Sequence, residues 1–321
     1  MRRLMNRLVA LVAAAATVTA FAQAYPTRTI TLIVPFSAGG PTDTIGRMLG
    51  ERMQRSLGQT VVVENVVGAG GTIANAKAMQ AAPDGYTIEI GHIGTHVLAP
   101  AVQSLNVDYV NGFEPIAMVA TNPEVIVSKL DFPAKDLKQL VAHVKANPGK
   151  VSYSTGGAGT PSHIMAVEFA AVAAPLNIVH YKGAAPAMQD VIAGHVDLSF
   201  DQAATALNYV RGGKVRAYAI TAKTRIASAP DIPTVDEAGL PGFYMSIWHA
   251  FWAPKGTPKD ALDRMYQETV KAMRSPELKN VWEAQGATAG GESPAEFEKL
   301  IHSEIAKWAK VVKDAGAKVD N

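Results

Sequence analysis

Residues 29–45 read TITLIVPFSAGGPTDTI, and this stretch predicts the fold class. Its first seven residues are apolar or β-branched throughout, as in a strand that is covered on both faces. The loop FSAGG follows, and Pro41 then suits the first turn of a helix. Apolar residues recur there at spacings of three and four, as on one face of a helix that stops at Gly58: Ile45, Met48, Leu49, Met53 and Leu57. The stretch predicts one strand–loop–helix unit.

The same unit recurs along the chain. Residues 60–64 have the pattern of a strand, residues 68–71 (GAGG) form a loop, and residues 72–82 read as a helix. A second series of alternating strands and helices covers residues 125–221. Strands that alternate with helices form parallel sheets. We therefore predict an α/β fold of two domains, each with its own mainly parallel sheet flanked by helices.

The end of the chain sets the predicted domain boundaries. Three helices, with no strand between them, are predicted at residues 258–274, 276–285 and 294–315, and we expect them to pack on the first sheet. Domain 1 is then discontinuous and contains residues 25–122 plus 231–321, and domain 2 contains residues 123–230. Three aromatic residues lie between the second strand–helix series and the late helices, and we expect them in the core rather than in a cofactor site: Trp248, Phe251 and Trp252.

Residues 1–24 have the pattern of a signal peptide. Three arginines precede an apolar run at residues 8–21, and Ala22-Gln23-Ala24 then matches a signal-peptidase site. We predict cleavage before Tyr25 and export to the periplasm. The alternative is an uncleaved membrane anchor, but the apolar run is shorter than a bilayer span. The absence of cysteine agrees with an oxidising compartment, although it does not require one.

The charge balance argues against a nucleic-acid partner. The whole chain has 30 Lys and Arg against 28 Asp and Glu, a formal charge of +2. Removing Arg2, Arg3 and Arg7 with the signal peptide leaves 27 basic residues, and so a charge of −1. Proteins that bind nucleic acid neutralise several phosphates with clustered cations. A nearly neutral chain without a basic block makes such partners unexpected.

Two glycine-rich loops are the candidate binding elements. Residues 36–40 and 155–159 each lie between a predicted strand and a predicted helix, where ligands collect in open α/β sheets. A helix N-terminus offers unpaired N–H groups and partial positive charge, and the hydroxyls of Thr160 and Ser162 add further donors. The alternative is that these glycines serve only as tight turns. Facing loops from two domains favour binding of an anion.

Motifs for other chemistries are incomplete. Residues 68–73 and 157–162 each lack the last glycine of GxGxxG, and neither GxxxxGK[ST] nor GxSxG occurs. His92 and His96 stand four apart, but glycines surround them and no nearby carboxylate completes a zinc site. We therefore predict no metal, no cofactor and no catalytic residues.

Three polar residues near the loops each have two interpretations. His163, in the first turn after the second loop, either donates to a ligand or lies on the helix surface. Asp43 either interacts with the helix dipole or points toward a ligand. Asp201, after a predicted apolar strand, either pairs with a polar or amino group of a ligand or caps the next helix.

Five stretches together resemble one known family. They are IVPFSAGGPTD, VVVENVVGAGGTIANAKAMQAAPDGYT, YSTGGAGTPSH, VHYKGAAPAMQDVIAGHVDL and DIPTVDEAGLPGF, and with the Tyr25-Pro26 start they cover nearly the whole mature chain. In order and spacing they resemble the Bug family, the extracytoplasmic solute receptors of tripartite tricarboxylate transporters. The resemblance implies a periplasmic two-domain flytrap that closes on a small carboxylate through backbone N–H groups and water.

The resemblance also implies a set of ligand-binding positions. In this sequence the matching residues are Phe36, Ser37, Ala38, Gly39, Gly40, Thr95, His96, Thr155, Gly156, Gly157, Gly159, Thr160, His163, Tyr181, Gly183, Ala184 and Asp201. Ala158 stands where relatives often carry Asn, so a side-chain contact is expected to be missing there, with the backbone donors retained.

We expect a solute-binding protein that presents a small carboxylate to membrane permease subunits, and not an enzyme. A secreted small-molecule hydrolase, a receptor that serves signalling, and the effector domain of a transcription regulator are the alternatives. The export signal and the lack of a helix-turn-helix segment disfavour the last. The sequence leaves aliphatic, amino and aromatic carboxylates open as ligands, and aromatic residues near the loops favour an aromatic acid or a dicarboxylate only weakly.

Overall fold

The computed structural model describes residues 25–103, 108, 109 and 111–314, and the predicted signal peptide lies outside them. The strands are β1 (Ile30–Val34), β2 (Val61–Asn65), β3 (Thr87–His92), β4 (Phe113–Ser128), β5 (Ser152–Thr155), β6 (Asn177–His180), β7 (Leu198–Gln202), β8 (Arg216–Ile220), β9 (Ser246–Pro254) and β10 (Thr288–Ala289). The helices are α2 (Pro41–Leu57), α3 (Thr72–Met79), α4 (Ala99–Val102), α5 (Leu137–Ala146), α6 (Pro161–Val172), α7 (Ala184–Ile192), α8 (Ala203–Arg211), α9 (Lys259–Met273), α10 (Pro276–Gln285) and α11 (Pro294–Asp314), with short helical turns η1 (Ala69–Gly71) and η2 (Gly94–Leu98).

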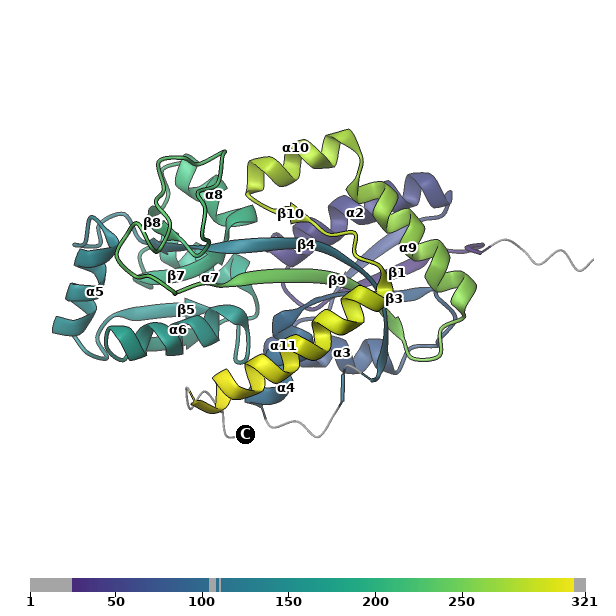
Figure 1. Cartoon of the computed structure of the whole chain (residues 1–321), viewed down its shortest axis with the longest axis horizontal. Coiled ribbons are helices and arrows are strands. Elements are labelled where there is room, and N and C mark those ends of the chain that lie inside the picture. Colours follow the sequence, from purple (N-terminus) through teal and green to yellow (C-terminus); the bar gives the residue numbers. More distant parts are fainter. Residues whose placement is uncertain (1–24, 104–107, 110, 315–321) are drawn as a thin grey trace, which may run out of the picture.

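Two lobes share one continuous sheet, with strand order β2-β1-β3-β9-β4-β7-β5-β6 (Figure 1). In the first lobe, β2, β1 and β3 are parallel, as predicted, and β9 is antiparallel to β3. In the second lobe, β5 is parallel to β6 and β7. The fold is therefore mixed α/β, with antiparallel strands where the lobes meet.

The long strand β4 corrects the prediction of two separate sheets. Its first part pairs with β9 as far as Pro123, and its remainder, from Glu124, pairs with β7. The sequence predicted a strand only at residues 125–128. Pro115 and two register shifts interrupt the pairing of β4 with β9, and these irregularities hide the strand from a search for regular alternation.

The first strand–loop–helix unit forms as predicted and builds the core of the first lobe. Ile30, Leu32 and Val34 of β1 pack with the apolar stripe of α2, including the fully buried Ile45 and Leu49. Burial of each such side chain contributes roughly 1.5–3 kcal/mol. Pro41 begins α2, and Gly58 ends it with a left-handed backbone, φ 67°. This core fixes the helix N-terminus at the carboxyl end of the sheet.

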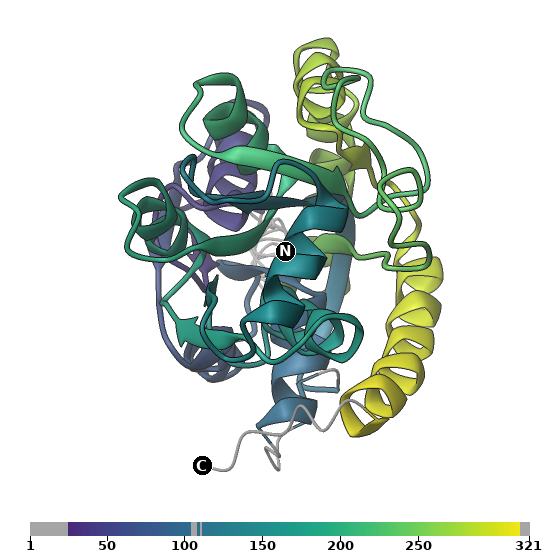
Figure 2. The same ribbon diagram turned by 90° about the vertical axis from the view of Figure 1, so that its left-hand side faces the viewer.

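The C-terminal elements differ from the prediction in two respects. A short strand, β10, lies between α10 and α11 and pairs with β4, whereas no strand was expected there. The helices α9 and α11 both pack on β4, whereas α10 contacts α8 of the second lobe as well as α9 and β10. Figure 2 shows α11 along one side of the molecule, and it packs against β4 and η2.

The chain returns to the first lobe later than residue 230, the predicted boundary. Residues 231–245 still pack on the second lobe: the N–H of Val235 donates to the oxygen of Ile220 (2.9 Å), and that of Met245 donates to the oxygen of Thr221 (3.2 Å). The sequence favoured an early crossing because Pro230 and Pro233 mark a loop. The loop instead adds a bridge between Thr234 and β8, and β9 makes the return.

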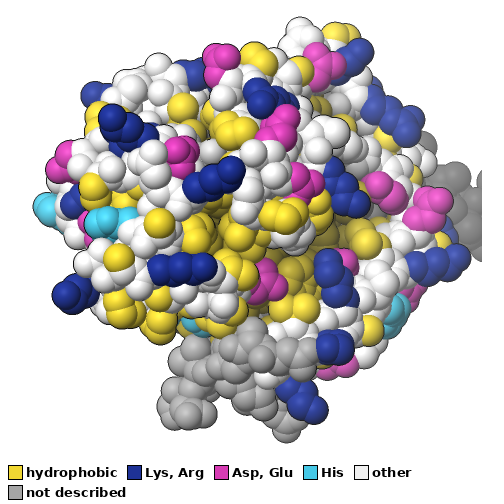
Figure 3. Space-filling model, turned by 60° about the vertical axis from the view of Figure 1, so that its left-hand side comes forward, with side chains coloured by type: hydrophobic (Ala, Val, Ile, Leu, Met, Phe, Trp, Pro, Cys, Tyr) yellow, Lys and Arg dark blue, Asp and Glu magenta, His cyan; other side chains and the backbone are white. Residues whose placement is uncertain are grey.

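The surface agrees with the charge argument on the face drawn in Figure 3, where Lys and Arg side chains are interspersed with Asp and Glu. Within residues 25–314 as described, no helix is both long enough and apolar enough to cross a membrane.

Candidate functional site

Loops from the two lobes touch each other in a closed arrangement. The N–H of Ser37 in the first lobe donates to the oxygen of Lys182 in the second (3.3 Å). The side-chain amide of Gln103 donates to the oxygen of Ala158 across the same boundary (3.2 Å). A Cβ at Gly159 would lie 2.5 Å from the Cα of Ala99, so the backbones meet there without room for a side chain.

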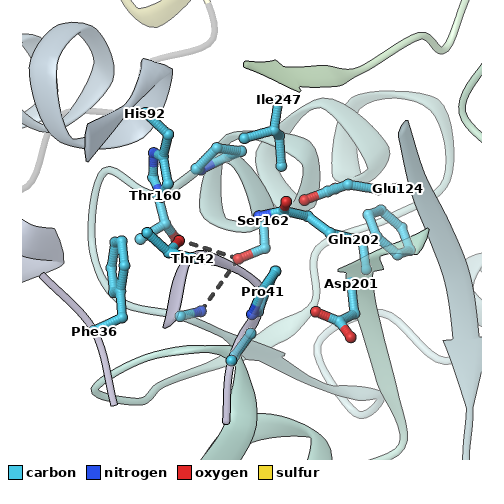
Figure 4. Close-up of a pocket in the computed structure, with 15 residues that line it drawn as sticks. Phe36, Pro41, Thr42, His92, Glu124, Thr160, Ser162, Asp201, Gln202 and Ile247 are labelled. Atoms are coloured by element: carbon cyan, nitrogen blue, oxygen red, sulfur yellow. Dashed lines mark hydrogen bonds between the residues drawn. The ribbon is translucent and has the colours of Figure 1, made fainter. Parts of the chain in front are cut away.

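A pocket lies between the lobes where three helices begin. Its lining includes Gly40, Pro41 and Thr42 at the start of α2, Thr160, Pro161 and Ser162 at the start of α6, and Ala184 at the start of α7 (Figure 4). Phe36, His92, Glu124, Gly156, Phe200, Asp201, Gln202 and Ile247 complete it. Six predicted residues line the pocket: Phe36, Gly40, Gly156, Thr160, Ala184 and Asp201.

In the first glycine loop, Asp43 holds the backbone. Its carboxylate accepts a hydrogen bond from the N–H of Gly39 (2.9 Å), and also from Arg47 and Asn65. Burial alone would raise the pKa of Asp43, but these hydrogen bonds outweigh it and lower the pKa below its usual value. Asp43 therefore holds the loop, and it is not among the residues that line the pocket described above. Ala38 and Gly39 are exposed, outside the pocket.

In the second glycine loop, side chains of the loop and of the first turn of α6 accept hydrogen bonds from the glycine N–H groups. Gly156 donates to the hydroxyl of Ser162 (3.1 Å), and Gly157 donates to that of Thr155 (3.1 Å). Gly159 donates to Nδ1 of His163 (3.2 Å). These three amides were predicted as ligand donors, but in the closed form they are occupied within the loop.

The donors that remain are the N–H groups at the helix N-termini. The hydroxyls near the pocket already have partners: that of Thr42 pairs with His249, that of Thr160 donates to the oxygen of Gly157, and that of Ser162 pairs with Thr160. Thr42 occupies the second position of α2, whose N-cap Gly40 provides no side-chain bond, and the first turn of a helix leaves its N–H groups without partners in the helix. The N-termini of α6 and α7 likewise have no side-chain cap. Their partial positive charges add at the pocket. An anion is the complementary ligand.

His92 lines the pocket, although the sequence considered it only as a metal ligand. Its Nδ1 accepts the N–H of Gly94 (2.8 Å), which places the ring proton on Nε2. Its ring stacks on Phe36, with centroids 5.0 Å apart. Burial lowers the pKa of His92 to about 3, so the ring is neutral at physiological pH. His92 therefore adds a neutral donor and an apolar wall.

Acceptors gather where β4 and β7 pair at the pocket. Glu124 lies opposite Gln202 in the register, and the next pair contains Asp201. Burial, followed by the charge of Asp201, raises the pKa of Glu124 well above its usual value. Burial raises the pKa of Asp201 to about 6, although Thr205 and the backbone of Gln202 donate to it. Glu124 and Gln202 were not predicted, because only cross-strand pairing brings them to Asp201.

Several predicted residues lie under the loops instead of in the pocket. Thr95 is fully buried and bonds to the backbone of His92, and His96 stacks on Trp252 with centroids 4.1 Å apart. Thr155 contacts His180, and the Tyr181 hydroxyl donates to Asp190. These residues lie beneath the loops. The two histidines considered for zinc stack on different rings, His92 on Phe36 and His96 on Trp252.

Ser37 and the glycines at positions 157, 159 and 183 form the contact between the lobes. A Cβ at Gly183 would lie 2.6 Å from Oγ of Ser37, and one at Gly157 would lie 3.4 Å from the backbone of Gly70. Small residues are required there because backbones from opposite lobes approach closely. They form a close contact between the two lobes.

Solved structures with the same architecture define the class of protein. Periplasmic binding protein BugD is 38% identical, with a TM-score of 0.88 over 92% of this chain and 99% of that chain. MatC from Rhodopseudomonas palustris with bound malate is 34% identical, with a TM-score of 0.86 over 90% and 100% of the two chains. R. palustris Rpa4515 with adipate is 30% identical, with a TM-score of 0.88 over 91% and 98%. The fold is that of a two-domain periplasmic binding protein.

The family follows from the sequence match. The model of the tripartite tricarboxylate transporter family receptor matches residues 45–317. The chain belongs to this family, and the predicted resemblance to Bug receptors is confirmed.

Proposed function

We propose that this protein captures a small carboxylate or dicarboxylate between its lobes and presents it to the permease subunits of a tripartite tricarboxylate-type membrane transporter. The observation that carries the proposal is the convergence of the first turns of α2, α6 and α7 on one pocket. The family supports the receptor role, and MatC and Rpa4515, whose structures contain malate and adipate, support the ligand class.

The available donors are sufficient for useful affinity. Each hydrogen bond to a charged group contributes about 1.5–3 kcal/mol. Two or three such bonds to a carboxylate, after the cost of ordering, support micromolar binding, which corresponds to about −8 kcal/mol. Phe36 and Ile247 provide apolar walls for the carbon chain of the ligand.

Closure couples binding to recognition by a transporter. The first lobe contributes the N-terminus of α2, and the second contributes those of α6 and α7, so a ligand contacts all three only when the lobes are together. Binding then shifts the population toward the closed form by the difference in affinity between the two forms. A permease that contacts both lobes distinguishes the loaded receptor.

We propose a revised contact set and domain division. The pocket-lining members of the predicted set contact the ligand, and its other members position the loops or permit closure. Residues 25–122 plus the chain from Ser246 form domain 1, and residues 123–245 form domain 2.

The proposed location is the periplasm, with a mature start at Tyr25. Sequencing the N-terminus of protein recovered from the periplasmic fraction tests that start.

A ligand screen tests the proposed function. The mature chain is titrated calorimetrically with aliphatic, amino and aromatic carboxylates, and each acid is matched with its amide, which lacks the carboxylate charge. Thermal unfolding of the chain is measured in parallel. An acid that binds only the folded state raises the melting temperature, and the matching amide leaves it unchanged. Mass spectrometry of the ligand after incubation tests the receptor role against hydrolysis: unaltered ligand supports a receptor. Failure of every carboxylate to bind would contradict the proposal.

A further inference from the structure

One wall of the pocket contains buried acceptors without partners. Glu124 and Asp201 are each 2% exposed, and Gln202 is 6% exposed. Glu124 Oε2, Asp201 Oδ1 and Gln202 Oε1 have no hydrogen-bond partner in the structure. Leaving a buried polar atom without a partner is destabilising, and more so when the atom is charged. Three such atoms in one wall indicate that a donor completes this part of the site.

Among the residues that the structure describes, no cation is found to shift the pKa of either carboxyl group. The partner of Asp201 Oδ2 is the hydroxyl of Thr205, at 2.6 Å, which is a neutral donor. The other titratable groups at the pair are Tyr153, whose pKa is itself raised by burial and then by Glu124, and the neutral His92 in the pocket lining. A cationic group of a ligand would therefore stabilise both carboxylates in their ionised forms.

The pocket has donors on other sides. Figure 4 shows Glu124 and Asp201 on the side opposite Phe36 and His92, with Ser162 between them at the start of α6. The helix N-termini and His92 Nε2 donate, and the wall of β4 and β7 accepts. A ligand with only carboxylate groups would pair with these donors and leave the acceptors of β4 and β7 without partners.

We propose that the ligand is an amino acid or a related carboxylate with an ammonium group. Its carboxylate lies against the first turns of α2 and α6, and its ammonium group lies against Glu124 and Asp201. This inference rests on the proposed function and narrows its ligand class. The alternative is a dicarboxylate whose second carboxylate accepts hydrogen bonds from protonated Glu124 and Asp201.

Calorimetry with matched acids distinguishes these two ligands. L-Alanine is compared with propionate, and L-glutamate with glutarate, at pH 6.5 in buffers of different ionisation enthalpy, which report the protons exchanged on binding. We expect at least one amino acid to bind 10-fold or more tightly than its partner and to release protons, because the ammonium group favours the ionised pair. Equal or tighter binding of the partner acid in both pairs would overturn the inference and leave the proposed function standing.

Substitutions locate the effect. Glu124→Gln and Asp201→Asn are expected to reduce the affinity for the preferred amino acid at least 10-fold and to leave that for its partner within threefold. Glu89→Gln is the matched control, because Glu89 is also fully buried with both carboxylate oxygens unpartnered but lies outside the pocket lining. Retained selectivity in both pocket variants would also overturn the inference. Failure of all four acids and of the wider screen would contradict the proposed function itself.

Discussion

The two glycine-rich loops have the same composition but solve different problems. Gly39 and Gly159 both have left-handed backbones, with φ of 81° and 77°. A Cβ at Gly39 would meet no atom within 4 Å, whereas one at Gly159 would meet the Cα of Ala99 in the opposite lobe at 2.5 Å. Gly39 is therefore required only for its backbone conformation, and Gly159 is also required for the approach of the lobes.

The loops also differ in the chemistry that holds them. Asp43, an ionised carboxylate with a lowered pKa, accepts the N–H of Gly39. His163, a neutral imidazole, accepts the N–H of Gly159. Because both glycine amides are occupied, glycine-rich composition does not by itself provide donors to a ligand. In the proposed function, the ligand donors come from the helix turns that the loops position.

The largest effect is expected from exchanging each of these glycines for alanine. Gly159→Ala places a methyl group against the backbone of the other lobe, so full closure becomes impossible and carboxylate affinity falls about 100-fold or more, equivalent to about 3 kcal/mol. Gly39→Ala imposes similar backbone strain, about 1–2 kcal/mol of stability, and leaves the affinity within twofold. Calorimetric titration and urea unfolding measure the two quantities. Equal losses of affinity in both variants would contradict the distinction between the loops.

Acidification is expected to weaken the second loop before the first. Burial, followed by the charge of His180, lowers the pKa of His163 to about 4, whereas an unfolded histidine has a pKa near 6.5. The unfolded chain therefore binds a proton that the folded chain refuses, and stability falls as the pH decreases from 6.5 toward 4. By pH 5 this amounts to about 2 kcal/mol.

His163→Asn removes this titration and keeps a possible acceptor for Gly159. Between pH 7 and pH 5, the variant is expected to lose about 2 kcal/mol less unfolding free energy than the wild type. Urea unfolding at the two pH values gives the difference. The matched control for the substitution itself is His302→Asn on the exposed surface of α11. Parallel pH profiles for wild type and His163→Asn would exclude the proposed acid sensitivity.

The smallest effect is expected for a hydroxyl of the second loop. Ser162→Ala removes the acceptor of the Gly156 N–H and the partner of the Thr160 hydroxyl, both in the pocket lining. Loss of about 1 kcal/mol corresponds to a fivefold decrease in carboxylate affinity. Ser303→Ala, which removes an exposed hydroxyl that bonds to its own helix, is the control and leaves affinity unchanged. An unaltered affinity in Ser162→Ala would remove this hydroxyl from the binding site.

Local patterns predicted much of the fold. The run of apolar residues in β1 and the stripe of α2 formed as expected, with Pro41 and Gly58 at the helix ends, because each signal depends on neighbours along the chain. Trp248, Phe251 and Trp252 are core residues, also as predicted. The continuation of β4 from one lobe into the other was missed. Its pairing with β9 joins segments more than 100 residues apart and includes bulges.

The site was predictable only where a loop signal coincided with the pocket. Phe36, Gly40, Gly156 and Thr160 belong to strand–helix turns, and such turns lie at one edge of the sheet. Glu124 and Gln202 carry no comparable local signal, because they reach the pocket through the β4–β7 register. The pairing of glycine amides with Ser162 and His163 likewise depends on the folded loop.

The distance between the lobes tests the central claim, that a carboxylate closes this protein, most directly. The chain contains no cysteine, so Glu51→Cys on α2 and Lys145→Cys on α5 provide two exposed labelling sites without background. Double electron–electron resonance measures the distance between spin labels at these two positions, with and without a saturating carboxylate identified by the screen. We expect a longer, broader distribution without ligand and a shorter, narrower one with it, and no shortening in Gly159→Ala. A distribution unchanged by a ligand that calorimetry shows to be bound would contradict the account.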